Sequence, residues 1–195
     1  MGVVRGYFIQ YKFILPENTK HSSYEYQKLF RAIYGYTQNV NKGTGKQYKY
    51  FRDGILSNFP YVRTGKNCVI IPQSAFQKLT SFFKTGINPT HNWKVKGNWK
   101  AVYYMDEKDV NSNLVVESVL HLIERTKLSS KKSIFDDLTY LTSLENPDKN
   151  YIKKILITSE KIVADDWFKT ALQTSEKVKK FKELHDRLQK LVLVN

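Results

Sequence analysis

The order of hydrophobic periods in residues 1–105 narrows the possible folds more than any other feature. Strand-like alternation comes first, in "GYFIQYKFIL" (residues 6–15), and helical spacing follows "SSYE" (residues 22–25). Further strands are expected at 36–40, 47–52, 60–63 and 67–71, a second helix in 74–85, and a last strand in 98–105. A period of two indicates strands and a period near 3.6 indicates helices. This order, with one extra hairpin after the first helix, predicts an α+β fold: a ferredoxin-like sandwich with an antiparallel sheet and two helices.

Serine residues are expected to cap both helices of this region. In "SSYE", Ser22 can accept a hydrogen bond from the backbone near Glu25, while Glu25 reaches back to the cap. Ser74 stands at the corresponding place before the second helix. These signals place the helix starts but leave open which side of the sheet the helices cover.

Residues 106–195 carry helical patterns throughout, which predicts an all-helical C-terminal region. In its last part, apolar positions from Trp167 to Val192 follow heptad spacing, although Thr174 and His185 interrupt the seam. Two interpretations of this seam stay open. It packs back on the protein's own helices, or it forms a coiled-coil homodimer through residues 164–195.

Charge and aromatic residues divide the chain at the same place. The chain has a net charge of +14, and residues 1–105 hold 16 Lys and Arg against three acids, with 21 of the 27 aromatic residues. Residues 106–195 hold 16 Lys and Arg against 15 acids, so they are nearly neutral. We therefore expect two domains: a basic, aromatic-rich nucleic-acid-binding domain in 1–105 and a helical region in 106–195.

The stretch "KQYKYFRDG" (residues 46–54) shows what kind of partner this composition fits. Lys46, Tyr48, Tyr50 and Arg52 alternate onto one side of the expected strand, so rings and cations share a face that is poorly suited to burial. Cations attract phosphates and exposed rings stack on bases, whose faces single strands offer and duplexes hide. The sequence therefore predicts a non-enzymatic protein that binds single-stranded DNA or RNA through a sheet surface. The candidate nucleic-acid-binding residues are Phe8, Lys12, Lys28, Arg31, Lys42, Lys46, Tyr48, Lys49, Tyr50, Arg52, Arg63, Lys66, Lys94, Lys96, Trp99, Lys100 and Tyr104.

Three other interpretations compete with this one. His21, beside two serines and Lys20, is the one candidate catalytic residue, for a metal-free RNA-processing nuclease. The hairpin "YVRTGKNCVI" (residues 61–70) could instead serve as the wing of a duplex-DNA-binding or packaging protein. A basic module that docks on an acidic protein would have the same composition.

Metals, cofactors and membranes are not indicated. The single cysteine, Cys68, excludes an intrachain disulfide, and the four histidines lack zinc-ligand spacing, so we expect no metal and no cofactor. No run approaches the roughly 18 apolar residues of a membrane span, and the start of the chain lacks the features of a secretory signal. The expected location is the cytoplasm, in association with the nucleoid or with ribonucleoprotein.

Overall fold

The structure, a computed structural model, describes residues 4–41, 43, 47–128, 132–145 and 147–193. Its contacts divide the chain into two compact units. Unit 2 consists of Tyr7–Asn58 and Arg63–Glu107, and unit 1 of the described residues in Met1–Gly6, Phe59–Val62 and Lys108–Asn195. The separation into domains at residue 105 stays a prediction.

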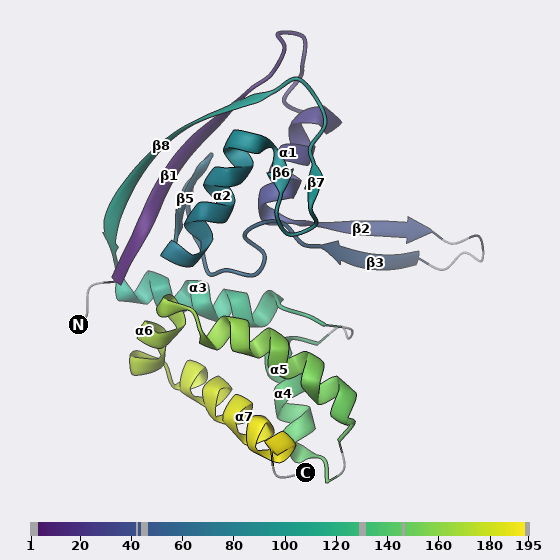
Figure 1. Ribbon diagram of the computed structural model, residues 1–195, viewed down its shortest axis with the longest axis vertical. Helices are drawn as coiled ribbons and strands as arrows, with labels where there is room; N and C mark the ends of the chain where they lie inside the picture. The colour runs from purple at the N-terminus through teal and green to yellow at the C-terminus, as the bar shows by residue number, and fades with distance from the viewer. Residues whose placement is uncertain (1–3, 42, 44–46, 129–131, 146, 194–195) are drawn as a thin grey trace. The chain divides into compact units, whose positions relative to one another are not determined.

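A four-stranded antiparallel sheet runs through unit 2 in the order β4-β5-β1-β8, and Figure 1 labels its strands β5, β1 and β8. Its strands are β1 (Val4–Ile14), β4 (Val62–Gly65), β5 (Cys68–Ile71) and β8 (Lys100–Val110). In the β1–β5 pair, Tyr7 lies opposite Ile71 and Gln10 lies opposite Cys68. The mixed α+β class predicted from the sequence is therefore present, and β8 continues past the expected end at residue 105.

Helices α1 (Tyr24–Tyr34) and α2 (Gln73–Thr85) pack on one face of this sheet. Alternation along β1 sends Ile9, Tyr11 and Phe13 into the core, where all three are buried. Tyr11 packs on Phe83 of α2 with ring centroids 5.3 Å apart. Phe13 meets Phe30 of α1 edge to face at 5.5 Å. On the opposite face of β1, Gln10, Lys12 and Ile14 are exposed, and among the described residues no helix of unit 2 covers that face.

The helix caps differ from the serines expected at these positions. Ser23, one residue after Ser22, caps α1, and its hydroxyl accepts a hydrogen bond from the Tyr26 N–H at 3.2 Å. The helix begins at Tyr24, so Ser23 is the N-cap residue. The hydroxyl of an N-cap residue can reach the backbone N–H three residues later, which here is that of Tyr26. At α2 the cap position is held by Pro72, without a side-chain hydrogen bond, and the helix already includes Ser74.

Two short hairpins of unit 2 stand outside the four-stranded sheet. β2 (Tyr36–Asn41) pairs with β3 (Gln47–Arg52), and Figure 1 shows this hairpin extending away from the sheet and helices of the unit. β6 (Ile87–Asn88) pairs with β7 (Trp93–Lys94), a hairpin that the sequence did not predict. A strand pair of this length leaves no measurable period in the sequence.

Glycine residues let the β2–β3 hairpin start close to the end of α1. Gly35 follows α1 with φ +77°, a conformation that favours glycine. Gly54 follows β3, and a Cβ added there would lie 2.2 Å from the Gly35 nitrogen and 2.6 Å from the Ile33 carbonyl oxygen. The close approach of these backbones fixes where both strands of the hairpin leave the core.

Unit 1 contains five helices among its described residues: α3 (Ser112–Arg125), α4 (Ile134–Ser143), α5 (Lys149–Val163), α6 (Asp166–Thr174) and α7 (Glu176–Leu193). Their apolar faces form one core, in which Leu122, Leu138, Trp167 and Phe181 are at most 1% exposed. The Trp167 indole N–H also donates to the Arg5 carbonyl oxygen at 3.0 Å, which ties the first residues of β1 into this unit.

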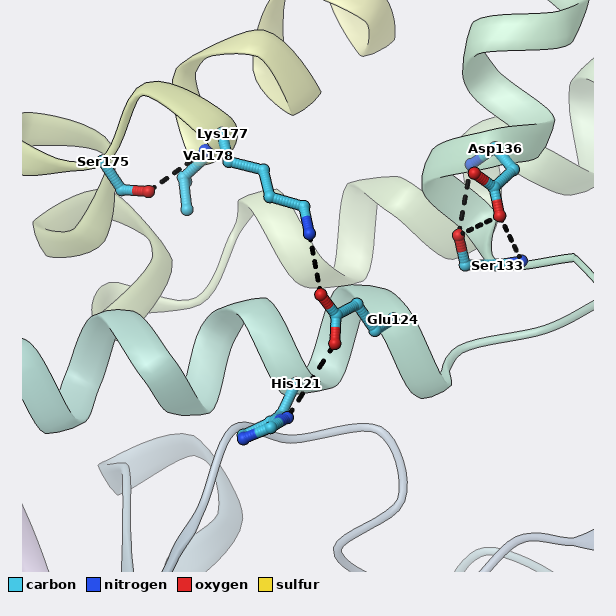
Figure 2. Close-up of polar contacts among 7 residues, drawn as sticks. All are labelled: His121, Glu124, Ser133, Asp136, Ser175, Lys177 and Val178. Atoms are coloured by element: carbon cyan, nitrogen blue, oxygen red, sulfur yellow. Dashed lines mark hydrogen bonds and ion pairs between the residues drawn. The ribbon is translucent and has the colours of Figure 1, made fainter.

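Some polar side-chain contacts link two of these helices, and others cap the start of a helix (Figure 2). Glu124 of α3 accepts a hydrogen bond from the Lys177 ammonium of α7 at 2.7 Å. Ser133 and Asp136 form a capping box that starts α4, and these hydrogen bonds lower the pKa of the Asp136 carboxyl below its usual value.

The predicted heptad seam does not run through a single helix. It is interrupted at Ser175, where α6 ends, and the Ser175 hydroxyl accepts a hydrogen bond from the Val178 N–H at 3.4 Å (Figure 2). Most apolar seam positions on both helices are buried inside unit 1, Val178 and Leu188 completely, whereas Val192 near the end of α7 is half-buried. This burial favours internal packing over the coiled-coil dimer, which stays a prediction.

Candidate nucleic-acid interface

The β2–β3 hairpin displays aromatic rings and cations on open surfaces. Every residue of β3 is exposed, with Tyr48, Tyr50 and Phe51 at 39%, 41% and 52%. Tyr48 lies opposite Val40 and Tyr50 opposite Gln38, so both tyrosines share one face of the ribbon. Their rings are nearly parallel, with centroids 6.4 Å apart. The rings of "KQYKYFRDG" thus stand on the surface rather than in the core.

A pocket of about 390 Å³ lies at the base of this hairpin, and we call it pocket 1. Helix α1, both strands of the β2–β3 hairpin and the β6–β7 hairpin contribute to its wall. Its lining contains three cations and three large aromatic residues, and it consists of Tyr24, Lys28, Arg31, Ala32, Tyr36, Gln38, Arg52, Asp53, Asn88, His91 and Trp93. Its volume falls within the range of pockets that hold small ligands.

The two arginines of pocket 1 are held by neighbouring side chains. The Arg31 guanidinium lies 5.0 Å from the centre of the Tyr36 ring and 5.6 Å from that of Tyr24, and it donates to Gln27 at 3.1 Å. Arg52 donates from Nε to the Gln38 side-chain oxygen at 3.0 Å. Because a guanidinium has five N–H donors, each arginine retains several for an anionic ligand.

An acid and a histidine sit beside these cations. Burial raises the pKa of the Asp53 carboxyl, and the nearby His91 opposes that rise. The His91 Nε2–H donates to the Asp53 backbone oxygen at 2.8 Å. Asp53 therefore keeps its proton to a higher pH than usual. The protonated carboxyl carries no negative charge, which leaves the three cations of pocket 1 free to attract anions.

The loop that carries His91 is fixed by Asn88, which is 1% exposed. Its amide donates to the Ala32 carbonyl oxygen of α1 at 3.3 Å, and its side-chain oxygen accepts from the Thr90 N–H at 2.9 Å. Thr90 in turn donates to the Gly54 carbonyl oxygen at 3.4 Å. The β6–β7 hairpin is thereby tied both to α1 and to the end of β3, so the walls of pocket 1 are connected.

A second hollow of about 440 Å³, pocket 2, also involves the β6–β7 hairpin. Three lysines line it together with aromatic residues from α2, β8 and the loop between β7 and β8: its wall consists of Phe83, Lys84, Thr85, Gly86, Lys94, Val95, Gly97, Trp99, Lys100, Ala101 and Tyr103. Trp99 is an anchored part of this wall, since its ring packs edge to face on Phe13 at 5.7 Å and its N–H donates to the Val95 carbonyl oxygen at 3.1 Å.

The residues predicted from the sequence to bind nucleic acid fall into separate groups. Lys28, Arg31 and Arg52 line pocket 1, the β3 residues Tyr48, Lys49 and Tyr50 lie beyond it on the hairpin, and Lys94, Trp99 and Lys100 line pocket 2. Lys96 is exposed in the loop between β7 and β8. Lys42 and Lys46 lie outside the described residues.

The remaining predicted residues lie on or beside the four-stranded sheet. Phe8 and Lys12 alternate onto the face of β1 opposite the helices, and Tyr104 on β8 is 60% exposed. The Arg63 guanidinium covers the Tyr34 ring at 4.8 Å, and Lys66 stands exposed in the turn between β4 and β5. The single surface predicted from the sequence is therefore dispersed over the unit.

Residues of pocket 1 that the sequence did not indicate include Tyr24, Tyr36, Asp53, His91 and Trp93. The stretch "NWK" at residues 92–94 places an aromatic residue beside a cation, and this was the one signal that could have pointed to Trp93. By contrast, His21, the candidate catalytic residue, is exposed and packs its ring on Tyr26 at 4.5 Å, and it is not part of either pocket wall.

Three further observations bear on function. Among the described residues, no group of three or more His, Cys, Asp or Glu side chains could hold a metal ion. Within that same part of the chain, no helix combines the length and apolar character needed to cross a membrane. Comparison with protein families, with curated proteins and with solved structures gave no match.

Proposed function

We propose that the protein binds single-stranded DNA or RNA, without cutting it, through the β2–β3 hairpin and pocket 1. The observation that carries this proposal is the convergence of Lys28, Arg31 and Arg52 with three aromatic side chains on one pocket, next to the exposed tyrosines of β3. Cations neutralise phosphates whatever the base sequence, and each base stacked on a ring contributes about 1 to 3 kcal/mol.

A single strand fits these features better than a duplex does. The rings of pocket 1 and of β3 can stack only on bases whose faces are accessible, and a double helix hides those faces within its stack. Arginines that are packed on tyrosine rings, as Arg31 is, suit a ligand with alternating flat bases and charged phosphates.

The finer fold assignment belongs to the same proposal. Taking the strands of the four-stranded sheet in chain order, with a helix after the first and after the third, gives the element sequence of a ferredoxin-like sandwich. The order β4-β5-β1-β8 supports this assignment, with β2–β3 and β6–β7 as additions that build pocket 1. A helical C-terminal region then forms the second domain.

The test is a measurement of binding to labelled single-stranded DNA, single-stranded RNA and duplex of matched sequence over a salt series. We expect the single strands to bind more tightly than the duplex, with an affinity that falls steeply as salt rises. Arg31→Ala and Arg52→Ala should each lower the affinity and reduce the salt slope by roughly one.

Lys153→Ala is the matched control, because it removes an equal charge from an exposed position of α5 in unit 1. It should leave the affinity nearly unchanged. Absence of binding to any of the three nucleic acids at low salt would contradict the proposal, and tighter binding to the duplex would favour the wing or packaging alternative. Cleavage of labelled RNA that His21→Ala abolishes would favour the nuclease.

A further inference from the structure

The β6–β7 hairpin separates pocket 1 from pocket 2 through the alternation of its own side chains. Asn88 pairs with Trp93 and both line pocket 1, whereas the next pair, Ile87 and Lys94, lies on the other face of the ribbon and Lys94 lines pocket 2. Because successive side chains in a strand point to opposite faces, a two-residue strand supplies both pockets at once. The two hollows are therefore on opposite sides of one thin wall.

Lys28 joins the two pockets at the edge of this wall. It lines pocket 1, yet its ammonium nitrogen would lie 3.4 Å from a Cβ placed on Gly97, and Gly97 lines pocket 2. Gly97 has φ +132°, a conformation in which a side chain is strained, and it leaves the space that the Lys28 side chain reaches. A cation thus stands where a ligand would pass from one pocket to the other.

The composition of the two pockets is also alike. Pocket 2 contains Lys84, Lys94 and Lys100 beside the rings of Trp99 and Tyr103, and its volume is similar to that of pocket 1. Each pocket thus pairs cations with aromatic residues, the combination that accommodates phosphates and bases. An acidic protein would match the charge but would leave the rings in both pockets without partners.

We infer that pockets 1 and 2 are successive subsites for one nucleic-acid strand, which passes Lys28 on its way around the β6–β7 hairpin. This inference rests on the proposed single-strand binding and adds the path of the strand and a second place of contact. It makes the affinity depend on strand length, because a strand that fills one pocket reaches the other at a high effective concentration.

The experiment is a series of oligothymidylates and oligouridylates from about two to about ten nucleotides long, within the site sizes known for single-strand binders. We expect weak binding of the shortest oligonucleotides, then a rise of roughly 10²-fold or more once one strand spans both pockets. The stoichiometry should be one long strand per protein.

Substitutions in each pocket test whether both pockets are needed for the rise of affinity with strand length. The double variant Lys94→Ala with Lys100→Ala should abolish the length-dependent rise, and Arg31→Ala should weaken oligonucleotides that occupy pocket 1 at every length. Lys28→Met keeps the aliphatic stem and removes the charge, so it should weaken short strands in pocket 1, as Arg31→Ala does, and should in addition reduce the rise. Lys153→Ala combined with Lys154→Ala removes two charges from exposed positions of α5 and serves as control, with circular dichroism to confirm folding of every variant.

The set of outcomes distinguishes failure of this inference from failure of the proposed function. Failure of wild-type protein to bind any oligonucleotide overturns the proposed function and the inference together. Binding without a rise at any length, or two long strands bound per protein, overturns the inference alone and leaves single-strand binding in place. Equal competition by polyglutamate of matched charge would show that the pockets recognise acidic chains and would overturn both.

Discussion

The tyrosines of β3 can be removed at little cost in stability because they are not part of a core. Tyr48→Ala and Tyr50→Ala should each weaken single-strand binding by about 1 to 3 kcal/mol and leave the salt slope unchanged, since a neutral ring releases no counterions. Binding titrations over a salt series measure both effects. Phe51→Ala on the other face of the ribbon is the matched control.

A thermal melt distinguishes this result from simple unfolding. Truncation of a buried aromatic residue costs about 3 to 5 kcal/mol, whereas exposures near 40% at both tyrosines predict a much smaller loss. A large fall in melting temperature with unchanged affinity of the folded protein would mean that the rings pack inward and that Lys49 and Phe51 form the binding face.

Asp53 gives unit 2 a predictable dependence on pH. Burial raises the pKa of its carboxyl in the folded protein above the ordinary value of 3.8, so folding favours the protonated form. The stability that the protonated Asp53 carboxyl gives to the folded protein is complete below pH 3.8 and is lost as the pH rises through the folded-state pKa. Asp53→Asn removes this penalty, so the variant should melt at a higher temperature than wild type at neutral pH, and this advantage should disappear in acid.

The same substitution should change binding in the same direction. Without a carboxylate near Lys28, Arg31 and Arg52, pocket 1 should hold a single strand more tightly at neutral pH, with a smaller gain in affinity on acidification. Melting curves and binding titrations from pH 4 to pH 8 measure both predictions. A less stable Asp53→Asn variant at neutral pH would show that attraction to His91 outweighs the cost of burial.

At the scale of elements, the base of the β2–β3 hairpin depends on the close approach of Gly54 to Gly35. Gly54→Ala places a methyl group 2.2 Å from a backbone nitrogen, and backbone cannot move aside as a flexible side chain can. Overpacking of this kind costs about 1 to 3 kcal/mol, so chemical denaturation should show a loss in that range. Gly65→Ala, in a position whose nearest neighbour is 4.0 Å away, provides the comparison and should cost far less.

Gly54→Ala should also weaken strand binding more than its stability loss accounts for, because the hairpin and pocket 1 share this corner. Thr90 donates to the Gly54 carbonyl oxygen, so a shift of the backbone there also moves the loop that carries His91. Unchanged affinity in the folded variant would show that the hairpin and the loop are independent.

Helices and strands with a clear hydrophobic period could be predicted from the sequence, whereas pocket 1 could not. Alternation in β1 and helical spacing in α1 and α2 follow from which side chains must be buried, and this information is local. The walls of pocket 1 come from Tyr24, Arg52 and Trp93, which are far apart in the sequence and meet through tertiary packing. The cations on these elements could be recognised from charge alone, but their grouping could not.

The break between α6 and α7 shows a different reason for failure. The heptad pattern continues through Ser175, so periodicity predicted one helix. Serine favours helix starts over helix interiors, because its hydroxyl satisfies a backbone N–H that a new helix leaves open. The capping preference of Ser175 therefore separates α6 from α7, although the heptad pattern of apolar residues continues across it.

At the scale of the whole molecule, removal of residues 164–195 should affect the two units differently. It deletes α6 and α7, which supply the completely or almost completely buried Trp167, Phe168, Phe181 and Leu188. Unit 1 should lose its cooperative unfolding transition, while unit 2 keeps its strands, helices and pockets and still binds single strands, if more weakly. Denaturation curves and binding titrations of the shortened chain test this prediction.

Light scattering of the full and shortened chains adds the oligomeric state. A dimer that becomes a monomer on truncation would support the coiled-coil alternative, with part of the affinity lost through avidity. A shortened chain whose unit 2 is also unfolded would contradict the independence of the units.

The hydrogen bond from Trp167 to the Arg5 carbonyl oxygen has a consequence for synthesis on the ribosome. All residues of unit 2 precede residue 108, so this unit can fold while the helices that follow it are still being translated. Arg5 is translated long before α6, because its partner Trp167 lies 162 residues later. At about 5 to 20 residues per second, this hydrogen bond can form only about 8 to 32 seconds after Arg5 has been translated.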